Sequence, residues 1–77
     1  MRNYSLQVII EQDEDGIFIA ECPALQGCYA QGKTYEEAIK NIKDVIAMCI
    51  EELREEKKKF NLKYPEVIGI KSLEVAV

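Results

Sequence analysis

The side chains best suited to chemistry in this 77-residue chain are five carboxylates near its start. They are Glu11, Asp13, Glu14, Asp15 and Glu21. Carboxylates bind Mg²⁺ and Mn²⁺ and can act as general acids or bases. A two-metal nuclease site, however, needs carboxylates that separate rigid strands and helices hold together. A run of Asp and Glu that ends in glycine is typical of a solvated turn. We therefore interpret residues 13–16 as a polar turn and keep a degenerate metal-dependent nuclease as an alternative.

Other catalytic groups are scarce. The chain has no histidine, and so lacks the most common general base near neutral pH and the most common metal ligand. The three cysteines, Cys22, Cys28 and Cys49, fit neither a disulfide framework nor a paired C-x-x-C zinc site. The isolated glycines form no phosphate-binding loop. We expect reduced thiols, no cofactor, no resident metal and a protein that is not an enzyme.

The charge of the chain is concentrated in its first part. Fourteen acidic and ten basic residues give a net charge of −4. Residues 1–32 hold five acidic side chains and one basic side chain, whereas nine of each follow in residues 33–77. An acidic protein gains little from the counterion release that drives nucleic-acid binding. A basic protein is therefore the expected partner.

Nothing in the hydropathy pattern predicts a membrane protein. The longest unbroken apolar run is Val45–Ile50, and a membrane helix needs roughly 20 apolar residues. The first residues contain no apolar signal-peptide core. We expect a cytoplasmic protein.

Three β-strands are predicted in the first half of the chain. Tyr4–Glu11 begins with alternating apolar residues and continues with β-branched ones, and Ile17–Cys22 is a second strand-like run. Gly16, which can adopt a positive φ, allows the two strands to form a hairpin. Pro23 cannot donate to a strand ladder and so ends the second strand. Cys28–Gln31 is predicted as a short third strand.

A long helix and a last strand are predicted to follow. Thr34 can cap a helix that begins at Tyr35, with Glu37 completing a capping box. Apolar residues then recur at three- and four-residue spacing, as on a helix that packs against a sheet. These residues are Ala38, Ile39, Ile42, Val45, Ile46, Cys49, Ile50 and Leu53. Ser72–Val77 alternates again and is predicted as the final strand.

These elements predict a single domain over residues 1–77 with an α+β, two-layer βββαβ fold. One helix can cover only one face of the sheet. Both faces carry apolar residues whichever register forms, because Val8, Ile9 and Ile10 follow one another. A second copy or a partner protein is expected on the other face. Candidate contacts with a partner include Tyr4, Tyr29 and Tyr35, which flank the predicted sheet and the start of the helix, since tyrosine is enriched at interfaces.

Several short motifs occur in an order that resembles the HicB-like antitoxin family over Tyr4–Leu53. They are Glu11-x-Asp13-Glu14-Asp15-Gly16, Ala20-Glu21-Cys22-Pro23-Ala24-Leu25-Gln26-Gly27-Cys28, Gln31-Gly32-x-Thr34-x-Glu36-Glu37-Ala38 and Asn41-Ile42-Lys43. The resemblance implies a partial ribonuclease-H-like βββαβ fold without that fold's catalytic carboxylates. It also implies an antitoxin that occludes the active site of a HicA-like toxin, a small basic ribonuclease that cleaves messenger RNA.

The resemblance leaves two functions open. The first is neutralisation of a HicA-like toxin by a dimeric antitoxin. The second is an orphan HicB-like homodimer that acts as a binding or structural module without a toxin. Longer family members append a DNA-binding domain that does not follow here, so we expect no direct DNA binding. The residues predicted to contact a partner are Glu11, Asp13, Glu14, Asp15, Glu21 and Tyr29.

Overall fold

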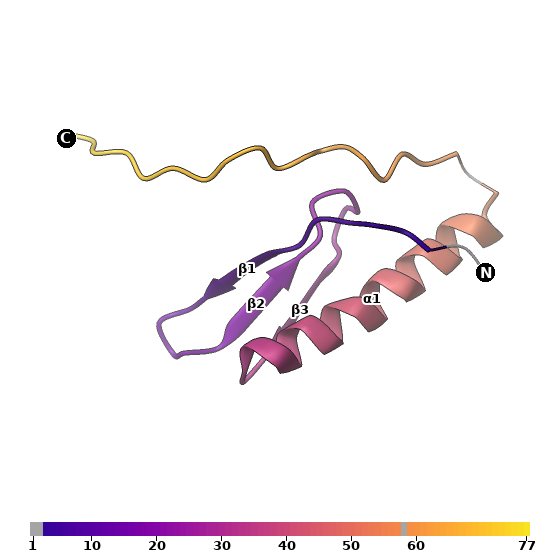
Figure 1. The fold of residues 1–77 in the computed structure, drawn as a ribbon, viewed down its shortest axis with the longest axis horizontal. Coiled ribbons are helices and arrows are strands. Elements are labelled where there is room, and N and C mark those ends of the chain that lie inside the picture. Colours follow the sequence, from indigo (N-terminus) through magenta and orange to yellow (C-terminus); the bar gives the residue numbers. More distant parts are fainter. Residues whose placement is uncertain (1–2, 58) are drawn as a thin grey trace.

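The fold is a three-stranded antiparallel sheet with one helix packed across it. The computed structural model describes residues 3–57 and 59–77. Its elements are β1 (Ile9–Gln12), β2 (Phe18–Glu21), β3 (Tyr29–Gly32) and α1 (Tyr35–Glu55). The strands lie in the order β1-β2-β3, and α1 covers one face of the sheet (Figure 1). The predicted α+β, two-layer architecture is confirmed.

A short turn joins β1 to β2. The Gly16 backbone N–H donates to the Asp13 carbonyl oxygen at 3.0 Å, and Gly16 has a φ of +84°. The Asp13 carboxylate accepts hydrogen bonds from the backbone N–H groups of Asp15 and Ile17, each at 2.9 Å. A tight turn followed by a left-handed glycine matches the twist of the adjoining strands. The predicted hairpin is therefore present, and Asp13 stabilises it.

The connection between β2 and β3 folds back against the core. The Cys22 N–H donates to the Cys28 carbonyl oxygen at 2.9 Å, and the Cys28 N–H donates to the Leu25 carbonyl oxygen at 3.2 Å. Leu25 is only 6% exposed, so the middle of this loop belongs to the hydrophobic core. Cys22 and Cys28 are buried, and all three cysteines are free thiols, as predicted.

Helix α1 begins where its capping residue predicts. The Thr34 hydroxyl accepts a hydrogen bond from the Glu37 backbone N–H at 3.1 Å. Such a cap satisfies one of the amides that a helix start leaves unpaired. The apolar stripe of α1 faces the sheet, and Ala38, Ile42 and Ile50 are its buried members.

The first strand is shorter than predicted. Residues 4–8 have no strand partner in the structure, although Tyr4, Leu6 and Val8 pack against the core. The sequence pattern marks their apolar side chains correctly. The strand itself requires a neighbouring backbone, and β2 reaches only as far as Glu21, opposite Ile9.

The predicted final strand at Ser72–Val77 is not formed within the described residues, so their element order is βββα. This segment is extended and runs alongside the sheet without a strand partner (Figure 1). Its side chains are exposed, including Leu73 at 72% and Val75 at 76%. Alternating apolar residues favour an extended backbone, but a strand also needs a hydrogen-bonding neighbour. The wider ribonuclease-H-like arrangement stays a prediction.

Candidate partner-binding face

The register of the sheet separates its side chains into two faces. Ile10, Ala20 and Ala30 lie opposite one another across the three strands and pack in the core beneath α1. Successive residues of a strand point to opposite faces. The residues between these therefore point away from α1, and we call their surface the open face. It consists of Ile9, Glu11, Ile19, Glu21, Tyr29 and Gln31.

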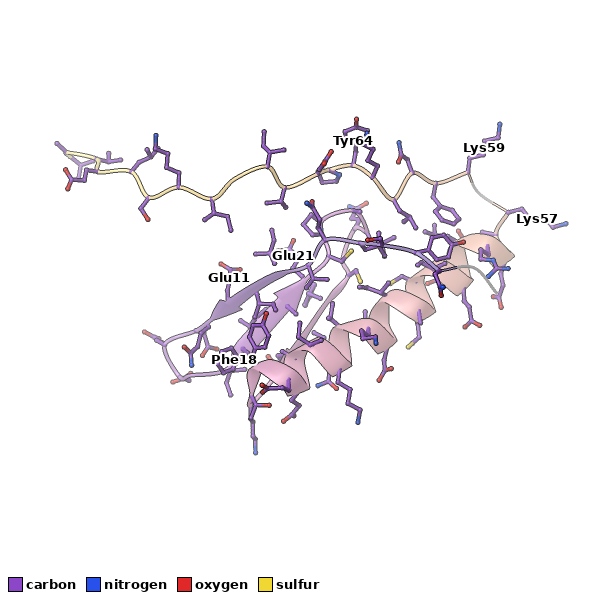
Figure 2. All side chains as sticks on the ribbon, in the orientation of Figure 1. Glu11, Phe18, Glu21, Lys57, Lys59 and Tyr64 are labelled. Atoms are coloured by element: carbon purple, nitrogen blue, oxygen red, sulfur yellow. The ribbon has the colours of Figure 1, made fainter. Side chains whose placement is uncertain are left out.

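The open face combines carboxylates with apolar side chains. Glu21 lies between Ile9 and Tyr29 in one row across the sheet, and Ile19 lies between Glu11 and Gln31 in the next row. Glu11 and Glu21 project from their strands away from α1 (Figure 2). Tyr29 is 65% exposed. Exposed apolar groups beside like charges suit a partner that buries the former and pairs with the latter.

The structure separates the six predicted contact residues into two groups. Glu11, Glu21 and Tyr29 share the open face. The residues of the hairpin turn lie beyond the end of β1, where Glu14 and Asp15 are exposed. The Asp13 carboxylate holds the turn together through its two backbone hydrogen bonds. Asp13 therefore has a structural role that does not depend on a partner.

Sequence reasoning did not single out Ile9, Ile19 and Gln31, which complete the open face. Ile9 and Ile19 are half-buried, and neither belongs to the core beneath α1. Their signal in the sequence is an isoleucine at a position where the alternation of the strand calls for a polar residue. That signal can be interpreted only once the register is known.

The thiols of Cys22 and Cys28 lie away from the open face and are chemically unreactive. Burial raises the pKa of the Cys22 thiol above its ordinary value of 9.0. Burial, together with the charge of the nearby Cys49, raises the pKa of Cys28 to about 12. Both thiols therefore stay protonated near neutral pH, and a protonated thiol is a poor nucleophile and metal ligand.

Within residues 3–57 and 59–77, no group of three or more Cys, Asp or Glu side chains is arranged to hold a metal ion. In the same part of the chain, no helix has the length and apolar character needed to cross a membrane.

The chain is similar to a known family over most of its length. The family model described as the HicB-like antitoxin of bacterial toxin–antitoxin systems matches residues 6–73. A UPF0150 protein of Synechocystis is 49% identical over 53 residues, covering 69% of this chain and 77% of the relative. A UPF0150 protein of Thermoplasma acidophilum is 52% identical over 58 residues, covering 75% and 78% of the two chains.

More distant relatives extend over a longer part of the chain. A UPF0150 protein of Archaeoglobus fulgidus is 38% identical over 68 residues, which are 88% of this chain and 90% of the relative. No solved structure gives a significant match. The family match includes all three strands, the helix and part of the extended C-terminal segment. This chain therefore belongs to the HicB-like antitoxin family of bacterial toxin–antitoxin systems.

Proposed function

We propose that this protein neutralises a HicA-like toxin, a basic ribonuclease, by binding it through the open face and occluding its active site. The observation that carries this proposal is the pair Glu11 and Glu21, set among exposed and half-buried apolar side chains. The family supports an antitoxin role and hence a toxin as partner. The protein acts in this proposal as a cytoplasmic inhibitor without catalysis of its own.

The charge distribution supports a basic partner. The first 32 residues carry the whole net charge of −4, and they include every residue of the open face. Opposite charges across an interface accelerate association and exclude partners of the same charge. An RNA-cleaving enzyme carries basic groups where it holds the phosphate backbone. The carboxylates of the open face can form ion pairs with these basic groups in place of the phosphates.

A second candidate function is a homodimer without a toxin. The apolar side chains of the open face and the exposed C-terminal segment favour it, because exposed apolar groups can be buried against a second copy. The two candidates are compatible, since an antitoxin can also be a dimer. They differ in whether a basic ribonuclease accompanies the chain.

Purification of the tagged chain from its native cells tests the proposal. Small basic proteins that accompany the chain are identified by mass spectrometry. Each is then assayed for RNA cleavage with and without the chain. The expected result is a ribonuclease whose activity falls as the chain approaches a stoichiometric amount. Co-purification of no ribonuclease, or of one whose activity the chain leaves unchanged, would contradict the antitoxin proposal.

A further inference from the structure

The extended C-terminal segment is attached to the rest of the molecule by a side chain in place of a strand ladder. The side-chain amide of Gln7 donates to the Val67 carbonyl oxygen at 3.2 Å and accepts from the Val67 backbone N–H at 2.7 Å. Both backbone groups of Val67 are thus paired, as they would be in a sheet. The side chain of Gln7 stands between the two backbones and so keeps them farther apart than neighbouring strands, which lie only about 4.8 Å from each other.

A groove lies between β1 and this segment. It has a volume of about 330 Å³ and is lined by Gln7, Val8, Ile9, Ile10, Val67 and Ile70. Val8 and Ile10 point toward α1 while Ile9 points to the open face. A groove lined by all three runs along the outer edge of β1. The C-terminal segment runs beside the groove, and its chain direction is the same as that of β1 (Figure 1).

The outer edge of β1 has backbone groups available for a further strand. The Asp13 N–H donates to the Ile17 carbonyl oxygen, so residues 9, 11 and 13 direct their backbone groups toward β2. By alternation, Ile10 and Gln12 direct theirs away from β2, toward the outer edge of the sheet. Within residues 3–57 and 59–77, β2 is the only strand paired with β1.

The groove suits an extended segment with one apolar side. No lining residue carries a charge, which gives a basic toxin no electrostatic advantage there. The chain itself contains a suitable segment in residues 71–77, where Leu73, Val75 and Val77 alternate with Ser72, Glu74 and Ala76. This segment cannot enter the groove of its own chain as long as Gln7 holds Val67 on the far side.

We propose that residues 71–77 of a second copy occupy this groove, and that the two copies exchange these segments about a twofold axis. Each segment then pairs with β1 of the other copy on one edge and with the partner segment on the other. A twofold axis perpendicular to the strands makes the two segments antiparallel. Because each segment runs in the direction of β1 of its own chain (Figure 1), the inserted segment runs antiparallel to the receiving β1. The result is one continuous sheet. This inference specifies the dimer named under the proposed function and does not depend on the toxin.

The exchange would cover apolar side chains in both copies. In each copy, residues 67–77 and the groove-facing residues of β1 would be covered, together with their surroundings. The exposed apolar side chains Leu73, Val75 and Val77 would pack against the other copy.

Sedimentation equilibrium of the full-length chain tests the exchange. The wild-type protein is expected to be a dimer. The variant L73D/V75D places charges on the apolar side of the segment, and its dimer dissociation constant should rise by about a hundredfold or more. The matched control S72D/A76D places the same charges on the side that already carries Ser72 and Glu74, and should remain dimeric. A monomeric wild-type chain, or dimers in all three samples, would overturn the proposal.

A mixing experiment distinguishes exchange from pairing within one chain. The variant I10P lacks a backbone donor in the groove but keeps its C-terminal segment, whereas I10A keeps the donor. Circular dichroism first establishes that I10P is folded. I10P alone and L73D/V75D alone should be monomers, and their mixture should form a heterodimer through the one intact groove and the one intact segment. Absence of that heterodimer overturns exchange, and I10A mixed with L73D/V75D is the control in which the other chain keeps both its backbone donor and its C-terminal segment.

Toxin neutralisation is measured separately on the same variants. A monomeric L73D/V75D variant that still silences the ribonuclease supports the antitoxin proposal and leaves the exchange to be judged by sedimentation alone. The two proposals can therefore fail independently.

Discussion

Gly32 at the end of β3 and Ala38 in α1 approach each other so closely that no side chain fits between them. A Cβ atom on residue 32 would lie 2.5 Å from the backbone nitrogen of Ala38. Gly32 is buried, and Ala38 is 0% exposed. This contact fixes the start of α1 against the sheet. It also explains Gly32 by packing.

Replacing Gly32 by alanine should destabilise the protein. The added methyl group meets backbone atoms, which cannot move aside as a flexible side chain can, and overpacking costs about 1–3 kcal/mol or more. Urea unfolding measures the loss in the free energy of unfolding. Gly69→Ala is the matched control, because nothing lies within 4 Å of its added Cβ. Equal stabilities of the two variants would show that the close approach is absent.

Asp13 should contribute to stability through its carboxylate. Asp13→Ala removes the acceptor for the N–H groups of Asp15 and Ile17. The expected loss is about 1 kcal/mol, because the site is exposed and water can replace part of the interaction. Asp13→Asn keeps an acceptor oxygen and should lose less. A variant as stable as the wild type, measured by urea unfolding, would argue against the structural role of Asp13.

The thiols should react in the order of their exposure. Cys49 is half-buried, whereas Cys22 and Cys28 are 0% and 1% exposed. At pH 8, a thiol reagent should modify Cys49 first and the other two only after unfolding. Cys49→Ala should remove the fast phase. Rapid modification of the other two thiols in the folded protein would show that this part of the core opens readily.

Alkaline pH should lower the stability of the fold through Cys28. Its pKa is about 12 in the folded protein and near its ordinary value of 9.0 after unfolding. The unfolded chain therefore loses the proton first as the pH rises, and stability falls between about pH 9 and pH 12. The contribution is fully present below pH 9. Cys28→Ala should reduce the slope of unfolding free energy against pH, whereas an unchanged slope would exclude Cys28 as its source.

Tyr29 should contribute to partner binding more than an equally exposed tyrosine elsewhere. Tyrosine is frequent among the few interface residues whose truncation costs more than 1 kcal/mol. Tyr29→Ala should weaken binding of the proposed toxin by about tenfold. Tyr64→Ala, which truncates a tyrosine exposed to a similar extent in the C-terminal segment, is the control. Calorimetric titration that finds the two variants equally affected would place the interface elsewhere.

Local sequence signals predicted most of this fold because they act over a few residues. The Asp13–Gly16 turn and the Thr34 cap depend on neighbours close in sequence, and both are formed. The apolar stripe of α1 likewise follows from helical period. The composition of the open face depends on register, which pairs Glu21 with Ile9 and Tyr29 across three strands.

The C-terminal segment could not be predicted in the same way. Its alternation correctly indicates an extended backbone, but strand formation depends on a partner that the pattern does not specify. The bond from Gln7 to Val67 joins residues 60 positions apart and has no local signal. The sequence therefore reveals which segments are extended and leaves their neighbours to the tertiary structure.

The most direct test of the account is the affinity of the co-purifying basic ribonuclease for two charge-reversal variants. E11K/E21K reverses the carboxylates of the open face, and E51K/E55K reverses two exposed carboxylates of α1. Both change the net charge by the same amount. The account predicts that E11K/E21K binds and inhibits the ribonuclease about tenfold or more weakly, while E51K/E55K behaves as the wild type. Equal weakening by both variants, or by neither, would contradict binding through the open face.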